Sequence, residues 1–277
     1  MKDKESFFIN QFPSLQIGDD GAVIGRQIYT KDLFFEDIHF KRAWMTLEEI
    51  AAKSMLVNIS DAIVMNAKVC YALIGIEIPS DFTPQQLEAL AKGFLKVADT
   101  YGFEIIGGDT IAGEKLNISV TLISESDRPV FRRGVQKGDL AAYTGNLGSV
   151  KRDLEKLFRG EPVPSSSKFI RPQLRGDFFY EAAPFIHAAL DISDGLSKDL
   201  SRLAKANRMG FAFNRNISEE ELCSGEEYEI LFTFDPKNLD TLKEIARKHN
   251  TPLTVFATAV DGRYESVCPE NHFQTQE

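Results

Sequence analysis

Residues 46–66 read TLEEIAAKSMLVNISDAIVMN, a helical pattern that carries a carboxylate where an apolar residue is expected. Thr46 and Glu49 have the spacing of a capping box, so the sequence predicts that a helix begins there. The buried face of this helix is marked, at steps of three and four, by Leu47, Ile50, Ala51, Ser54, Val57 and Asp61. A buried charge without a partner is strongly unfavourable. The pattern therefore predicts a cation or a fork of hydrogen-bond donors beside Asp61, unless the helix frays near Ser60 and leaves Asp61 exposed.

Other short acidic segments lie beside glycine or small residues, and several of them follow predicted strands. They are 18–21 (GDDG), 30–32 (TKD), 107–110 (GGDT), 191–195 (DISDG) and 225–227 (GEE). Loops at strand ends often converge on a ligand, and we expect Asp109 and Asp191 to face each other across one cleft. Oxygen ligands in this number, without a cluster of His or Cys, suit Mg²⁺ rather than zinc.

The composition indicates a globular protein of two domains. The chain has 277 residues, of which 43% are hydrophobic, a net charge of −9 and a pI near 5.1. An acidic chain without a basic stripe is not expected to bind nucleic acid or an anionic membrane. The N-terminal sequence lacks the pattern of a signal peptide, and no apolar run approaches the length of a membrane span, so we expect a cytoplasmic protein. Three scattered cysteines, Cys70, Cys223 and Cys268, indicate reduced thiols rather than a disulfide framework.

The order of predicted elements favours an α+β arrangement over a repeating βαβ array. The apolar run 69–76 predicts a central strand, and Thr83-Pro84 with Gln86 predicts the start of a helix that ends near Gly102. A strand at 103–106 is expected to lead into a loop at 107–110. The composition changes at 127–139, which places a domain boundary there.

Common nucleotide-binding and hydrolase motifs are absent. The sequence contains no Gly-x-x-x-x-Gly-Lys-Ser/Thr loop, no Gly-x-Gly-x-x-Gly fingerprint, no His-Arg-Asp catalytic loop and no Gly-x-Ser-x-Gly elbow. The usual folds that carry these motifs are therefore disfavoured.

Eight motifs follow one another in order over most of the chain. They are GDD (18–20), TKDLFFEDIHF (30–40), NISDAIVMNA (58–67), GGDT (107–110), RRGVQKGD (132–139), TGNLG (144–148), LDISDGL (190–196) and SGEEYEILF (224–232). Together they resemble the thiamine-monophosphate kinase family, which lies in the superfamily that includes aminoimidazole ribonucleotide synthetase and selenophosphate synthetase.

The resemblance implies a two-domain α/β (α+β) fold of the aminoimidazole ribonucleotide synthetase type. Residues 1–134 would form an N-terminal ATP- and Mg-binding domain whose mixed sheet pairs in a homodimer, and residues 135–277 a C-terminal α/β domain that closes over substrate. The implied reaction is ATP-dependent phosphorylation of thiamine monophosphate to thiamine diphosphate with several Mg²⁺ ions.

The resemblance also implies roles for individual residues. Metal ligands would be Asp20, Thr30, Asp32, Asp61, Asp109 and Asp191, with Asp194 holding a further ion. ATP would contact Gly108, Asp109, Arg132 and Ser193, with Arg133 as the alternative arginine. The substrate would contact His39 near its phosphate, Glu226 near its rings, and Phe273.

Less specific interpretations of these residues, and other functions, remain open at this point. Asp20 can form a turn, Asp194 can cap a helix, and His39 can be an ordinary half-buried histidine. The connection between Gly210 and Ser224 is shorter than is usual in the family. One alternative function is another ATP-dependent reaction of the same superfamily, and another is a non-catalytic Mg-nucleotide-binding module.

Overall fold

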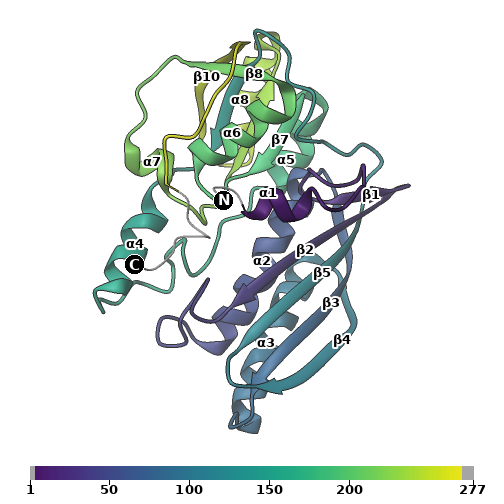
Figure 1. Ribbon diagram of the computed structural model, residues 1–277, viewed down its shortest axis with the longest axis vertical. Helices are drawn as coiled ribbons and strands as arrows, with labels where there is room; N and C mark the ends of the chain where they lie inside the picture. Colours follow the sequence, from purple (N-terminus) through teal and green to yellow (C-terminus); the bar gives the residue numbers. More distant parts are fainter. Residues whose placement is uncertain (1–3, 270–277) are drawn as a thin grey trace.

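The computed structural model describes residues 4–269, which form two five-stranded β-sheets with helices packed against them (Figure 1). The first sheet takes its strands from the N-terminal half of the chain and the second from the C-terminal half. Among the described residues, no helix is long and apolar enough to cross a membrane.

The first sheet is mixed, with the strand order β1-β2-β5-β3-β4. Its strands β3 and β4 are parallel, and the other neighbours are antiparallel. The elements of this half are α1 (Lys4–Ile9), β1 (Ala22–Ile24), β2 (Gln27–Phe35), α2 (Leu47–Val64), β3 (Lys68–Pro79), α3 (Pro84–Tyr101), β4 (Glu104–Gly113) and β5 (Asn117–Glu125).

The two long helices α2 and α3 begin where their capping boxes predict. Thr46 accepts a hydrogen bond from the backbone N–H of Glu49, and the Glu49 side chain accepts one from the N–H of Thr46. Thr83 and Gln86 repeat the arrangement at α3. Asp61 lies within α2, so the alternative of a helix that frays near Ser60 is wrong.

Residues 107–110 do not form the loop that was predicted there, because β4 continues through them to Gly113. Gly108 pairs with Ile74 of β3, and a Cβ at position 108 would lie 1.8 Å from the Ile74 carbonyl oxygen. The glycine therefore permits a close approach between two strands.

The second sheet is antiparallel throughout, with the order β7-β9-β6-β10-β8. Its elements are β6 (Leu140–Thr144), α4 (Ser149–Phe158), α5 (Gly176–Ala182), the 3₁₀ helix η1 (Ala183–Phe185), β7 (Ala188–Asp191), α6 (Leu196–Asn207), β8 (Met209–Phe213), α7 (Glu219–Cys223), β9 (Ile230–Phe234), the 3₁₀ helix η2 (Pro236–Asn238), α8 (Leu239–Lys248) and β10 (Leu253–Asp261).

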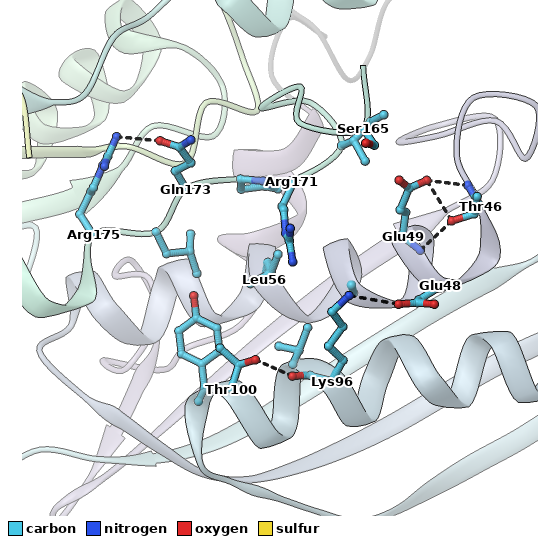
Figure 2. A pocket seen from close by; sticks show the side chains of 16 residues that line it. Thr46, Glu48, Glu49, Leu56, Lys96, Thr100, Ser165, Arg171, Gln173 and Arg175 are labelled. Carbon is cyan, nitrogen blue, oxygen red and sulfur yellow. Dashed lines mark hydrogen bonds and ion pairs between the residues drawn. The ribbon is translucent and has the colours of Figure 1, made fainter. Parts of the chain in front are cut away.

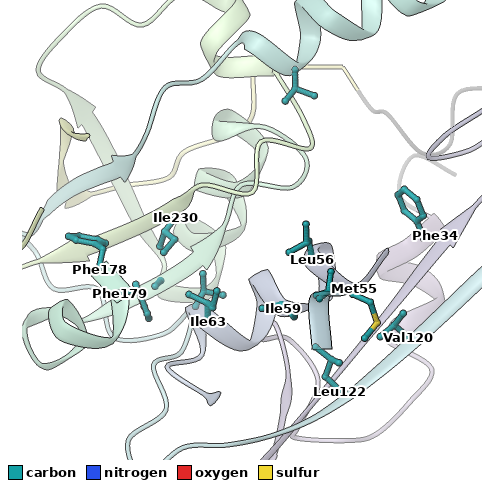
Figure 3. Packing of buried hydrophobic residues seen from close by; sticks show 14 of the residues in the cluster. Phe34, Met55, Leu56, Ile59, Ile63, Val120, Leu122, Phe178, Phe179 and Ile230 are labelled. Carbon is teal, nitrogen blue, oxygen red and sulfur yellow. The ribbon is translucent and has the colours of Figure 1, made fainter. Parts of the chain in front are cut away.

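Helix α2 packs against both halves of the molecule and thereby joins them. Figure 3 shows Met55 and Ile59 of α2 beside Val120 and Leu122 of the first sheet, while Ile63 faces a group from the C-terminal half. That group includes Phe178, Phe179 and Ile230. Burial of this apolar surface fixes α2 between the halves and places polar side chains on its remaining face at their junction.

The prediction that all three cysteines are free thiols is wrong. A disulfide joins Cys223, at the end of α7, to Cys268 in the segment after β10, with the two Cα atoms 5.5 Å apart. The bond crosses 45 residues of sequence, and scattered spacing alone does not show which side chains the fold brings together. Cys70 is the free cysteine.

Candidate functional site

Three carboxylates from distant parts of the chain meet where the two halves join. Asp20 belongs to the turn before β1, Asp61 to the C-terminal part of α2, and Asp191 to the end of the buried strand β7. Each offers an oxygen within 4.8 Å of the others. Gly21 lets the turn lie directly on β2, since a Cβ there would come within 2.9 Å of the Thr30 side chain. The three side chains are therefore spaced so that one cation can contact all of them.

Burial and mutual repulsion raise the pKa values of this cluster. The pKa of Asp61 lies well above its ordinary value because the side chain is buried and the charges of Asp32 and Asp191 are close. Burial, followed by the nearby charge of Asp20, also raises the pKa of Asp191. The same two causes raise the pKa of Asp32 to about 6. Several buried carboxylates cannot all ionise without added positive charge. All-oxygen ligands in such a cluster fit Mg²⁺.

Arg132 supplies one positive charge to the cluster. Its Nη2 and Nε donate to the two carboxylate oxygens of Asp20 at 2.6 and 3.1 Å, and its backbone N–H donates to Asp19 at 2.6 Å. Arg133 is exposed, so of the two predicted arginines the structure places Arg132 in the site. A guanidinium held in this bidentate way is also suited to contact a phosphate.

Thr30 and Asp32 approach the cluster from β2. The Thr30 side chain is buried and donates its hydroxyl hydrogen to Asn58 of α2. Asn58 in turn donates to the backbone oxygen of Val120 at 2.8 Å. Asp32 lines a cavity of about 180 Å³ together with Asp61 and Asp191. The predicted metal ligands of β2 are therefore beside those of α2 and β7.

The 191–195 segment contributes further groups to the same cavity. Ser60 donates to Asp191 at 2.8 Å, and Ser193 lines the cavity. Asp194 also lines it and forms an ion pair with Arg202. The next helix, α6, begins after Gly195, whose position as N-cap residue provides no side-chain cap.

His39 and Glu226 face the cavity from opposite halves of the chain. The Phe35 backbone N–H donates to His39 Nδ1 at 3.0 Å, so a neutral His39 carries its proton on Nε2. Glu226 has a left-handed backbone, with a φ of 53°, and its N–H donates to the Ser193 oxygen at 2.7 Å. This turn connects the cavity-lining Glu226 directly to the 191–195 segment.

Comparison with known proteins identifies the family. Residues 18–125 match the family described as AIR synthase related protein, N-terminal domain. The chain is 30% identical over 238 residues to a thiamine-monophosphate kinase of Nitrosopumilus maritimus (strain SCM1), which covers 79% of this chain and 77% of the relative. The chain belongs to the thiamine-monophosphate kinase family. It is also 30% identical over 245 residues to a thiamine-monophosphate kinase of Aquifex aeolicus (strain VF5), covering 78% and 80% of the two chains.

A solved structure agrees with this assignment. The structure described as "AaThiL complexed with AMPPCP and TMP" has a TM-score of 0.83 and 25% sequence identity to this chain, and the match covers 98% of this chain and 93% of that one. The fold is therefore that of the aminoimidazole ribonucleotide synthetase-like proteins, as the sequence motifs predicted, and the chain is a kinase of this family.

Lys53 is a functional candidate that the family motifs did not indicate. This lysine of α2 is fully buried, and its Nζ lies 2.7 Å from Glu226 Oε2 and 3.7 Å from the centre of the Phe169 ring. Burial lowers its pKa, which Glu226 opposes. The sequence contained one signal, because Lys53, Val57 and Asp61 are spaced by four and share a face of α2. Lys53 therefore holds Glu226 in place at the cavity.

A second buried ion-pair group supports the same loop. Lys168 Nζ contacts Glu227 at 2.8 Å and Glu229 at 2.9 Å, and Arg175 donates to both oxygens of Glu229 at 3.0 and 3.1 Å. The two glutamates flank Tyr228, which lines the cavity. The segment that carries Lys168 and Arg175 therefore fixes the loop 226–229. The sequence motifs contain the two glutamates of this ion-pair group but not Lys168 or Arg175.

Two predicted residues of the family motif lie away from the cluster within this chain. Gly108 and Asp109 belong to β4, an edge strand, and Asp109 is exposed. Strands β5 and β3 separate β4 from β2, which is roughly 14 Å at the usual strand spacing. Their roles stay predictions. Phe273, the third predicted substrate contact, lies outside the described residues.

Proposed function

We propose that the chain transfers the γ-phosphoryl group of ATP to the phosphate of thiamine monophosphate, giving thiamine diphosphate and ADP at a site that holds several Mg²⁺ ions. One observation carries the proposal: Asp20, Asp61 and Asp191 bring carboxylate oxygens within 4.8 Å of one another. They do so beside a cavity that His39 and Glu226 line. Family membership supports the choice of substrate.

In this reaction the protein mainly positions the two reactants and takes little part in covalent chemistry. A phosphate oxygen of thiamine monophosphate forms the new bond to the γ-phosphorus, while the bond from that phosphorus to the β–γ bridging oxygen breaks and its electron pair leaves with ADP. The attacking oxygen is already ionised at neutral pH, so no strong base is needed. Bound Mg²⁺ would neutralise the phosphate charges. Arg132 is placed to contact ATP, and Lys53 fixes Glu226 toward the substrate rings.

The test is ADP release by the full chain with MgATP and thiamine monophosphate, with the product identified by chromatography. Thiamine and formylglycinamidine ribonucleotide serve as alternative acceptors. Asp61→Asn keeps the shape of the side chain and removes its charge, and we expect it to reduce turnover by more than about a hundredfold while circular dichroism stays unchanged. Turnover with another acceptor, or binding of ATP with no turnover, contradicts the proposed reaction.

We also propose that the active form is a homodimer joined through the first sheet. Helices α2 and α3 cover one face of this sheet, and the other face is open (Figure 1). The open face carries exposed apolar side chains, including Leu33 and Tyr71, which are 50% and 44% exposed. Such side chains are typical of a surface that a partner covers.

The arrangement of strand edges supports a particular dimer. Strand β1 pairs with β2 only over Gln27–Tyr29, so no described strand pairs with the outer edge of β2 at Thr30 and Asp32. Within the described part of the chain, the edge strand β4 has no partner along its outer side. If the two sheets meet at their edges with their open faces turned toward each other, β4 of the second copy lies beside β2, and Asp109 of that copy reaches the acidic cluster. The division into residues 1–134 and 135–277 and the cytoplasmic location stay predictions.

A further inference from the structure

A second and larger cavity lies between the two halves, away from the acidic cluster. Its volume is about 690 Å³, within the range of small-molecule sites, and it lies between α2, α3 and the segment 165–175 (Figure 2). The two cavities share no residue. Ala52 and Leu56 of α2 face the larger one, whereas Val57 and Asp61 line the acidic one. The larger cavity is therefore a separate site on another side of α2.

The walls of this cavity combine apolar surface from both halves of the chain. Leu56 and Val97 come from the helices, and Ile170 and Leu174 from the segment 165–175. Facing walls of this kind suit the body of a flat apolar molecule, which would be held between α2–α3 and the segment.

Among residues 4–269, one cationic side chain that lines the cavity has no hydrogen-bonding or ion-pair partner. Glu48 binds Lys92 and Lys96 at 2.8 and 3.2 Å, and Glu49 is occupied by the capping box of α2. Arg175 is held by Glu229. Arg171, by contrast, makes no side-chain hydrogen bond or ion pair with any residue from 4 to 269.

Arg171 is directed toward the helices. Figure 2 shows its side chain reaching from the segment toward α2 and α3, between Leu56 and Lys96. Tyr101 of α3 also lines the cavity, and burial raises the pKa of its hydroxyl. Tyr101, like Arg171, makes no side-chain hydrogen bond within the described part of the chain. A planar cation and a hydroxyl thus face the cavity with free hydrogen-bonding capacity.

We propose that this cavity binds a small anionic amphiphile, a molecule with a flat apolar body and one carboxylate, sulfonate or phosphate group. The apolar body lies between Leu56, Val97 and Leu174, and the anionic group pairs with Arg171, whose guanidinium can bind two oxygens at once. A ligand there rests on the segment 165–175. The same segment carries Lys168 and Arg175, which hold the loop 226–229 of the acidic site.

The test uses 1-anilinonaphthalene-8-sulfonate, a flat aromatic sulfonate that fluoresces in apolar surroundings and cannot take up a phosphoryl group. It is titrated into the full chain with Mg²⁺ present. We expect saturable binding that Arg171→Ala weakens by about tenfold, as for the loss of one charged hydrogen-bonding partner. Thr100→Trp places a large ring into the cavity from the exposed side of α3 and is expected to abolish binding.

Two controls separate this site from others. Arg26→Ala removes an exposed arginine that pairs with Asp127 far from the cavity, and Asp61→Asn alters the acidic site; both are expected to bind the dye as the unchanged chain does. Because the measurement needs no turnover, it is independent of the proposed reaction. The proposal is wrong if the dye does not bind, if neither Arg171→Ala nor Thr100→Trp weakens binding, or if MgATP displaces the dye competitively.

Discussion

Asp32 is expected to make the proposed binding of Mg²⁺ depend on pH in an experimentally accessible range. Burial and the charge of Asp20 raise its pKa to about 6 in the metal-free protein. Below about pH 6 a metal ion must displace a proton from Asp32, so we expect the affinity for Mg²⁺ to rise as the pH increases from about 5 to 6. The stability of the metal-free protein changes in the opposite direction. Because the pKa of Asp32 is higher in the folded protein than its ordinary value of 3.8, the free energy of unfolding falls as the pH rises toward and through about 6.

Isothermal titration calorimetry from about pH 5 to about pH 8 measures this dependence. Asp32→Asn is the control and is expected to flatten the part of the curve below about pH 6, leaving the part contributed by Asp61 and Asp191. In thermal unfolding, the increase in melting temperature that Mg²⁺ produces should be larger at pH 8 than at pH 5. An affinity that does not change with pH contradicts the account of the cluster.

Lys53 is expected to act on the substrate through Glu226. Lys53→Met keeps the aliphatic bulk beside Phe169 and removes the ammonium group, so Glu226 loses the partner that fixes its carboxylate. We expect the KM for thiamine monophosphate to increase by about tenfold, with a smaller change in the KM for ATP. Glu226 is 21% exposed, so its carboxylate can turn to water, and the chain should remain folded.

A double-mutant cycle distinguishes this positioning role from an independent one. If Lys53 acts through Glu226, the double variant Lys53→Met/Glu226→Gln should bind substrate no more weakly than Glu226→Gln alone. If the loss of affinity in the double variant equals the sum of the losses in the two single variants, Lys53 contacts the substrate itself.

The disulfide is expected to stabilise the helix α7 and the segment after β10 as one unit. It joins residues 45 positions apart, and closing a loop of that length contributes about 2–4 kcal/mol to the free energy of unfolding. Cys223→Ser, or a reductant added to the unchanged chain, should therefore lower the free energy of unfolding by that amount and lower the melting temperature with it. Reductant should have no further effect on Cys223→Ser, and Cys70→Ser should respond as the unchanged chain does.

Elements whose ends depend on local chemistry could be predicted from the sequence, and those fixed by distant partners could not. The capping boxes at Thr46 and Thr83 need only residues three positions apart, and both helices begin as predicted. The extent of β4 depends on pairing with β3, whereas the sequence around Gly108 alone predicts a loop. The Cys223–Cys268 bond likewise depends on how the second half folds.

The candidate site shows the same division between local and distant information. Family motifs indicated Asp20, Asp61 and Asp191, and the fold brings them together. Lys53 was missed because its partner Glu226 lies 173 positions along the chain. At the scale of the molecule, the motifs indicate which residues belong to the candidate site. The packing of α2 between the two halves determines which of those residues lie close together.

Asp109 provides a test of the whole assembly. Within one chain it lies on the far edge of the first sheet, and a dimer that sets β4 beside β2 of the second copy carries it to the acidic cluster of that copy. Each complete site then takes Asp61 from one protomer and Asp109 from the other. Asp61→Asn and Asp109→Asn should both be inactive as homodimers, because each lacks one ligand at both sites.

Mixing the two variants, with subunit exchange, decides between a shared site and a site within one chain. A mixed dimer has one site with both substitutions and one with neither, so a shared site predicts recovery of about a quarter of the unchanged activity when half of the dimers are mixed. If Asp109 serves its own chain, every site in the mixed dimer carries one substitution and no activity returns. Leu33→Glu on the open sheet face should prevent the dimer and the recovery together, because it places a charge in the apolar contact.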